Sequence, residues 1–150
     1  DFLISFSYRY IISKKILNYF KDKAINLHIS YLPWNKGADP NLWSILENTP
    51  QGVTIHQMDY KLDAGQILYQ KKIFFNEDDT LKSSYEKLQI ELVELFIEKW
   101  ENIKHNKVTP KKQKGIGSYH KSSNKNSYQE LLTNGWDTKI KDLKGKAVND

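Results

Sequence analysis

Apolar and polar positions in the first part of the chain predict a strand, a helix and a second strand. Residues 1–8 form a short apolar run rich in strand formers, which predicts a buried strand. Ser13 can cap a helix that runs through Phe20, with Ile16 on its buried face, and residues 24–29 form the second strand. Units of this kind are built with parallel strands, so the two strands are predicted to run in the same direction.

The middle of the chain predicts a turn, a short helix and a pair of strands. Residues 33–37 form a turn containing Pro and Gly. Asp39 then stands where a helix N-cap belongs, and Pro40 takes the first helical position, where its missing N–H costs nothing. Residues 52–59 alternate like a strand, and residues 65–75 form another. The short link between them suits an antiparallel pair.

From Thr80 onward the pattern is that of a long amphipathic helix. Asp78, Asp79 and Thr80 supply cap and helix-dipole partners at its start. Apolar residues then recur at three- and four-residue steps, namely Leu81, Tyr85, Leu88, Leu92, Leu95 or Phe96, Trp100 and Ile103. This order of elements predicts an α/β fold with a mixed sheet flanked by helices.

Beyond Asn106 the composition turns to Lys, Gly, Ser and Asn, which predicts a small basic C-terminal appendage. We expect residues 107–150 to lie on a domain formed by residues 1–106. Eleven lysines against four acidic residues follow from Lys104 onward, so the net charge of +5 is a C-terminal property. The surplus is either a solvated surface or a patch that attracts a phosphorylated substrate or nucleic acid.

Length and composition restrict the class of protein. A chain of 150 residues with 39% hydrophobic content is long enough for one compact domain. The absence of cysteine excludes disulfides and thiolate chemistry, and no apolar run approaches the ~20 residues of a membrane-spanning helix. We therefore expect a cytoplasmic protein with no membrane partner. Because the chain enters a strand at Asp1 without an initiator Met, we expect it to be a piece of a longer protein.

Several common catalytic motifs are missing. The sequence has no dinucleotide-binding glycine fingerprint, no P-loop and no Gly-x-Ser-x-Gly elbow. Four histidines are present without metal-ligand spacing, so no metal is predicted: His28, His56, His105 and His120. Of these, His56 on its apolar strand is interpreted as a structural residue.

Three polar residues remain as candidates for chemistry. Asn26 and His28 are two residues apart on a strand, so they project from the same face. An amide such as that of Asn26 can donate to an oxyanion, and His28 can donate or accept a proton. The Asp63 carboxylate can orient that histidine or take a proton from an amine. The trio either performs acyl transfer without a covalent intermediate, or His28 is a hydrogen-bonded core residue.

Four motifs occur in a specific order across residues 1–103. They are Asn26-x-His28-x-Ser30-x-Leu32-Pro33, residues 37–40, residues 52–56, and Leu62-Asp63-Ala64-Gly65 followed by Ile67-Leu68-x-Gln70. In this respect the sequence resembles the folate-dependent formyltransferase family, which includes glycinamide ribonucleotide, methionyl-tRNA and nucleotide-sugar formyltransferases. The resemblance implies a Rossmann-like formyltransferase domain, of which the chain is the C-terminal part without its N-terminal strand-helix units.

The resemblance also implies residue roles. Asn26, His28 and Asp63 would be the catalytic residues. Our hypothesis is that Asn26 and protonated His28 stabilise the oxyanion of a tetrahedral intermediate, while Asp63 holds that charge on His28 and helps to remove the proton of the amine. The formyl donor would be 10-formyltetrahydrofolate, whose pterin would lie against Tyr10, Ile11 and Ile12 and against the loop that carries Asp59 and Leu62.

Within the family, residues 32–43 look most like nucleotide-sugar N-formyltransferases that modify amino-dideoxy sugars for surface polysaccharide such as O-antigen. This implies a nucleotide-sugar substrate, dTDP-linked, with nucleic acid not favoured. Candidate contacts are Trp34, Asn35, Lys36 and Tyr119, which either bind the substrate or are packed or solvated surface. Methionyl-tRNA formyltransferase and a noncatalytic remnant are the alternatives. The apolar stripe of the long helix is core or a homodimer surface.

Overall fold

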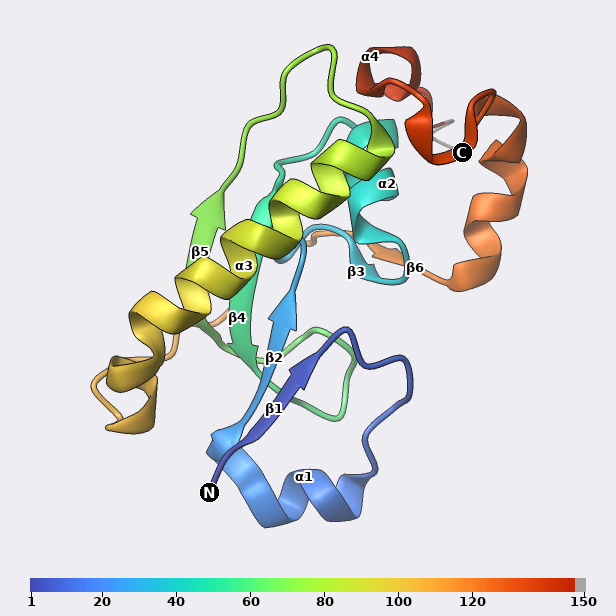
Figure 1. Ribbon diagram of the computed structural model, residues 1–150. Coiled ribbons are helices and arrows are strands. Elements are labelled where there is room, and N and C mark those ends of the chain that lie inside the picture. The colour runs from blue at the N-terminus through green and yellow to red at the C-terminus, as the bar shows by residue number, and fades with distance from the viewer. Residues whose placement is uncertain (148–150) are drawn as a thin grey trace.

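The computed structural model describes residues 1–147, which form a mixed sheet flanked by helices (Figure 1). The predicted α/β class is confirmed. The elements follow the chain in this order: β1 (Leu3–Phe6), α1 (Lys14–Phe20), η1 (Lys21–Lys23), β2 (Ala24–His28), β3 (Lys36–Gly37), α2 (Pro40–Leu46), β4 (Gly52–Gln57), β5 (Ile67–Lys72), α3 (Leu81–Lys104), β6 (Tyr119–His120), η2 (Ser122–Leu131), η3 (Gly135–Asp137) and α4 (Ile140–Leu143).

The main sheet has four strands in the order β1-β2-β4-β5. β1 and β2 run parallel, as the strand-helix-strand pattern predicted, and β4 pairs antiparallel with both β2 and β5. A second sheet contains only β3 and β6, which run parallel. This small sheet joins the turn after β2 to a segment more than 80 residues later in the chain.

Helix α3 lies across one face of the main sheet (Figure 1). The core between them consists of Ile25 and Leu27 of β2, Val53 and Ile55 of β4, and Leu88, Leu92 and Leu95 of α3. Side chains alternate between the two faces of a strand, so the polar residues at the intervening positions face away from α3. These polar residues are Asn26, His28, Thr54 and His56.

The start of α3 is fixed by a reciprocal cap, as the sequence predicted at Thr80. The Thr80 hydroxyl accepts from the Ser83 N–H at 3.1 Å, and the Ser83 hydroxyl accepts from the Thr80 N–H at 2.9 Å. Two N–H groups that the first turn would leave without partners are thereby satisfied. The predicted apolar stripe faces the sheet, with Leu88 and Leu92 almost fully buried.

Two predictions about the first unit are wrong. β1 is not buried, because Ile4 and Phe6 are 40% and 43% exposed, and β1 pairs only with β2 among the described residues. Ser13 does cap α1 by accepting from the Ile16 N–H at 3.4 Å. However, Leu17 and not Ile16 is the buried residue of this helix. On the predicted apolar face of α1, Ile16 and Tyr19 are 42% and 78% exposed, whereas Phe20 is half-buried.

Asp39 occupies the predicted N-cap position of α2, with Pro40 at the first helical position, but it does not cap the helix. Its backbone is left-handed and its side chain makes no cap hydrogen bond. The carboxylate pairs instead with the Lys125 ammonium at 3.1 Å. An ion pair with the C-terminal part of the chain has replaced the local bond that the sequence predicted.

Residues 107–147 are attached to the rest of the fold at several places. Ile67 bridges to Lys111, β6 pairs with β3, and Ile140 and Leu143 join a cluster of buried residues from α2. The boundary near residue 106 stays a prediction, and residues 148–150 of the predicted appendage lie outside the described residues. None of the described helices is long and apolar enough to cross a membrane.

The packing of α3 predicts a contrast between two aliphatic residues on the same helix. Leu92 is 0% exposed and Ile90 is 59% exposed. Leu92→Ala should lower the free energy of unfolding by about 2–5 kcal/mol, because it leaves a cavity against the sheet. Ile90→Ala should change it by less than about 0.5 kcal/mol. Chemical denaturation of the three proteins measures both values, and equal losses for the two variants would contradict the assigned core.

Candidate active site

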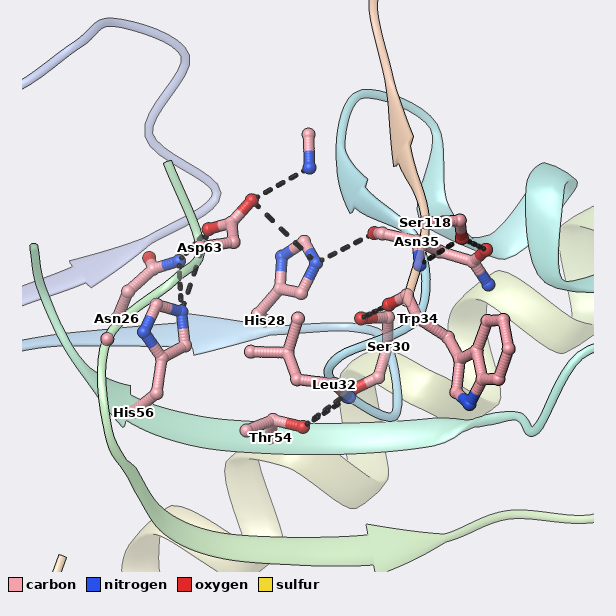
Figure 2. Close-up of polar contacts among 12 residues, drawn as sticks. Asn26, His28, Ser30, Leu32, Trp34, Asn35, Thr54, His56, Asp63 and Ser118 are labelled. Atoms are coloured by element: carbon pink, nitrogen blue, oxygen red, sulfur yellow. Dashed lines mark hydrogen bonds and ion pairs between the residues drawn. The ribbon is translucent and has the colours of Figure 1, made fainter. Parts of the chain in front are cut away.

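Strand β2 carries Asn26 and His28 on the face opposite α3, and the loop after β4 brings Asp63 to the same place (Figure 2). The Asn26 amide donates to Asp63 Oδ1 at 3.2 Å. His28 Nε2 lies 3.9 Å from Asp63 Oδ2. The three residues that the sequence brought forward therefore lie together, although 35 positions separate His28 from Asp63 in the chain.

Asp63 is a buried carboxylate with a left-handed backbone. Besides Asn26, the backbone N–H of Gly37 in β3 donates to it at 2.9 Å. Burial opposes ionisation of Asp63, but the imidazoles of His28 and His56 and the Gly37 hydrogen bond outweigh this effect. Together they hold the pKa of Asp63 well below its usual value of 3.8, so the group is a carboxylate at neutral pH.

His28 is buried, and its environment fixes its tautomer. Nε2 lies 3.1 Å from the Asn35 carbonyl oxygen, and a carbonyl oxygen only accepts, so Nε2 carries the proton. Nδ1 is left as the basic nitrogen. Burial lowers the pKa of His28 below 6.5, although Asp63 acts in the opposite direction. The neutral ring is therefore the main form at neutral pH in the ligand-free protein.

His56 is a buried, hydrogen-bonded histidine, in keeping with its interpretation as a structural residue, but its place in the same cluster was not predicted. Its Nδ1 donates to the Gln57 carbonyl at 2.7 Å. Its Nε2 lies 3.3 Å from Asn26 Nδ2 and 3.6 Å from Asp63 Oδ1. Both N–H groups of the Asn26 amide are thus directed at partners, Asp63 and His56. The alternation of residues along the two strands could have indicated this contact, because His56 lies directly opposite Asn26 in the antiparallel register.

The turn after β2 divides the predicted substrate contacts into two groups. Asn35 is fully buried, with its side chain bonded to the hydroxyls of Thr49 and Ser118. Its carbonyl points at His28 instead (Figure 2). Trp34 and Lys36 are half-buried, and Tyr119, opposite Lys36 in the β3–β6 register, is 53% exposed.

A cavity of about 400 Å³ opens beside this turn. It is lined by Trp34, Glu47, Asn48, Thr49, Pro50 and Ser118. Trp34 lines this cavity, whereas the side chain of Asn35 is fully buried. The side chains of Trp34, Lys36 and Tyr119 are therefore accessible, whereas Asn35 reaches the cluster only through its backbone carbonyl.

The residues predicted to hold a folate lie on two loops near Asp63. Tyr10 and Ile11 are 76% and 88% exposed, and Leu62, next to Asp63, is 49% exposed. Ile12 is half-buried and Asp59 is exposed. The second of these loops contacts helix α1, where the Tyr60 hydroxyl bonds to Asn18 and Lys14 lies 5.5 Å from the centre of the Tyr60 ring. Uncovered apolar side chains beside a buried polar cluster suit a flat ring that carries a reactive group.

Among residues 1–147 there is no group of three or more His, Cys, Asp or Glu side chains that could hold a metal ion. The cluster around Asp63 contains two imidazoles and one carboxylate, with its carboxylate oxygens already bonded to Asn26 and Gly37.

Comparison with known proteins finds relatives of one kind. The formyl transferase family model matches residues 1–99. The crystal structure of the formyltransferase PseJ from Anoxybacillus kamchatkensis, in complex with UDP-4,6-dideoxy-4-formamido-L-AltNAc and tetrahydrofolate, is 53% identical with a TM-score of 0.96. The match covers 99% of this chain and 78% of that chain.

Two further relatives are more distant. The N-formyltransferase from Helicobacter canadensis, in complex with folinic acid and dTDP-3-aminofucose, is 31% identical with a TM-score of 0.73, covering 80% of this chain and 45% of that chain. A methionyl-tRNA formyltransferase from Thermodesulfovibrio yellowstonii is 38% identical over 120 residues, which is 79% of this chain and 39% of that protein. The chain thus spans less than half the length of this curated relative.

The pKa shifts predict that acid destabilises the fold in two pH ranges. Folded His28 has a pKa below 6.5, so between that value and 6.5 the unfolded chain binds more protons and stability falls as the pH falls. The lowered pKa of Asp63 adds stability to the fold above about pH 3.8, and this stability is lost as the pH falls below that value. Wild-type protein should lose stability between about pH 7 and about pH 5 in urea unfolding, and His28→Gln should lose less.

The exposed His105 provides the control for this measurement, because its side chain lies at the end of α3 far along the chain from the cluster. His105→Gln should lose stability as the wild type does. An equal loss in His28→Gln and wild type would show that His28 is not held neutral in the fold.

Proposed function

Because the chain belongs to the formyl transferase family, we propose that it transfers a formyl group from 10-formyltetrahydrofolate to the amino group of a nucleotide-linked amino-dideoxy sugar. One observation carries the proposal: the ionised Asp63 is buried against the Asn26 amide at 3.2 Å and the His28 ring at 3.9 Å. A carboxylate, an amide donor and a neutral imidazole in one buried cluster can balance the charges that acyl transfer to an amine creates.

The folates in the two related crystal structures support 10-formyltetrahydrofolate as the cosubstrate. When bound, it would supply the formyl group for transfer. The residues that would hold it are Tyr10, Ile11, Ile12, Asp59 and Leu62; Tyr10, Ile11 and Leu62 leave apolar side chains exposed, and Leu62 is next to Asp63 in the chain. Their apolar groups would cover the ring and exclude water from the cluster.

Each catalytic side chain has a role that follows from its contacts. Nε2 of His28 is committed to Asn35, so Nδ1 is the atom that takes the proton of the attacking amine. The imidazolium that forms lies 3.9 Å from the Asp63 carboxylate, which stabilises it. It would then return the proton to the folate nitrogen as the bond from that nitrogen to the formyl group breaks, so that tetrahydrofolate leaves neutral. Asn26 donates to the formyl oxygen as negative charge develops there, and it gives up its longer bond, to His56 at 3.3 Å, to do so.

The acceptor is a sugar nucleotide in this proposal, and UDP is the nucleotide favoured by the 53% identity to an enzyme crystallised with a UDP-sugar. The earlier expectation of dTDP is supported by the more distant Helicobacter enzyme. Trp34, Lys36 and Tyr119 would contact this substrate from the accessible side of the turn. A role in O-antigen synthesis, a cytoplasmic location and a homodimer stay predictions.

Methionyl-tRNA formyltransferase is the second candidate, favoured by the 38% identity over 120 residues. A basic C-terminal segment would then contact phosphates of the tRNA. Such contacts weaken steeply as salt rises, whereas binding of a small sugar nucleotide depends on only a few charges.

Removing one donor or the buried carboxylate should abolish most of the activity. Asn26→Ala and Asp63→Asn are each expected to lower the rate of formyl transfer by ~10²- to 10³-fold. Asn102→Ala and Asp142→Asn change the same residue types at exposed positions and should keep the wild-type rate. Transfer to a UDP-linked 4-amino-4,6-dideoxy sugar, measured by product mass, gives the rates, and near-normal rates in folded Asn26→Ala would refute the assignment.

Competition experiments separate the two candidate acceptors. UDP should inhibit sugar formylation more strongly than dTDP. Bulk tRNA should have no effect at physiological salt. Retention of methionyl-tRNA on the protein, with an affinity that falls steeply between low and moderate salt, would instead favour the tRNA enzyme.

A further inference from the structure

The two backbone groups that contact the catalytic pair come from one turn. The carbonyl of Asn35 accepts from His28 Nε2 at 3.1 Å, and the N–H of Gly37 donates to Asp63 Oδ2 at 2.9 Å. Neither contact involves a side chain of the turn. The position of these two groups therefore depends on whatever holds the backbone of residues 35–37 in place.

Residues 117–120 hold this backbone from the C-terminal part of the chain. The Ser118 N–H donates to the Pro33 carbonyl at 3.2 Å, and the Lys36 N–H donates to the Ser118 carbonyl at 3.0 Å. The β3–β6 pairing continues the contact through Gly37 and His120. The turn is thus clamped on both sides of Asn35 by one short segment.

The close approach of the two segments leaves room only for glycine at two positions. A Cβ on Gly37 would lie 2.3 Å from the His120 carbonyl oxygen, and one on Gly117 would lie 2.0 Å from the Pro33 carbonyl oxygen. Both glycines also have positive φ angles, 87° and 65°. Residues 117–120 therefore have little freedom to shift against the turn.

The side chain of Ser118 completes the clamp at Asn35 itself (Figure 2). Ser118 Oγ accepts from the Asn35 N–H at 2.8 Å and lies 3.0 Å from Asn35 Oδ1. Rotating the Asn35 amide by half a turn keeps the Ser118 contact at 3.0 Å and adds one to Glu47 Oε2 at 3.2 Å. Asn35 has a left-handed backbone, φ 57°, that non-glycine residues rarely adopt, so it needs such support.

His120 anchors the other end of the segment. Its ring stacks on Trp43 of α2 with centroids 3.8 Å apart and planes at 6°. Its Nε2 also lies 3.0 Å from Glu47 Oε1. The segment is therefore tied to α2 independently of Ser118, so that a change at Ser118 should leave residues 119–120 in place.

We propose that Ser118 is a positioning residue for formyl transfer: it holds Asn35 in its left-handed conformation and so aims the Asn35 carbonyl at His28. This contact determines which ring nitrogen of His28 carries the proton and leaves Nδ1 basic. The catalytic consequence rests on the proposed function. The link from Ser118 to the His28 tautomer does not, and it can be measured without substrates.

Nitrogen NMR of the imidazoles in full-chain protein tests the link directly. The His28 signals, identified by their loss in His28→Gln, should show Nε2–H in wild type and a growing share of Nδ1–H in Ser118→Ala. Ser118→Thr keeps the hydroxyl and should restore the wild-type spectrum. Ser123→Ala changes an exposed serine on η2 and should have no effect. An unchanged His28 spectrum in folded Ser118→Ala would overturn the proposal.

Kinetics supply the second measurement. In Ser118→Ala, kcat should fall by about 10- to 100-fold, because a misplaced catalytic ring loses its alignment with the reacting groups. KM should change much less than kcat, because Ser118 acts mainly on His28, although it also lines the cavity beside Trp34. Ser118→Thr should recover most of the rate. Equal losses in the Ala and Thr variants would show that the hydroxyl is not the cause.

A further variant covers the case in which Ser118→Ala does not fold. Ser118→Cys keeps the size of the side chain and provides only a weak hydrogen-bond partner. It should shift the His28 tautomer in the same direction, and no shift in the folded Cys variant would overturn the proposal. If Ser118→Ala shifts the His28 tautomer but the wild-type protein formylates no sugar, the proposed function is refuted and the link from Ser118 to His28 stands.

Discussion

A carboxylate buried in a protein is stable only where polar partners replace the water that it loses. Asp63 finds these partners on separate stretches of chain: the Asn26 amide on β2, the Gly37 N–H in β3, and the imidazoles of His28 and His56 close by. Each partner is held by its own strand pairing. The pairing of the strands therefore fixes the groups that stabilise the Asp63 carboxylate. The same arrangement places this carboxylate beside His28.

The same strands serve packing and chemistry through their two faces. β2 and β4 present Ile25, Leu27 and Ile55 to α3, and the residues between them form the polar cluster. Replacing an aliphatic residue on one face and replacing a polar residue on the other therefore affect different properties of the protein. The first changes how firmly α3 is packed, and the second changes charge and proton positions. Helix α3 covers the apolar face, so the polar cluster lies on the other side of the sheet (Figure 1).

The parts of this structure that sequence could predict are those governed by local rules. Helix periodicity and the Thr80 cap predicted α3, and period-two alternation predicted that Asn26 and His28 share a face. The meeting of Asp63 with that pair came from the motifs of a known family. What could not be predicted depends on long-range neighbours: the exposure of β1, the burial of Asn35 and the place of His56 next to Asn26. Each depends on a partner strand or a distant segment whose register no local pattern records.

The contact between Ser118 and Asn35 spans 83 positions, which affects how the protein is made. During synthesis from the N-terminus, β2, the turn and the Asp63 loop all leave the ribosome well before residues 117–120. Until that segment arrives, Asn35 must hold an unfavourable backbone conformation without its support. The reaction centre is therefore expected to mature last, after the core of sheet and α3 has formed. Nascent chains and fragments that end before residue 117 would contain Asn26, His28 and Asp63 and still lack the support that fixes Asn35.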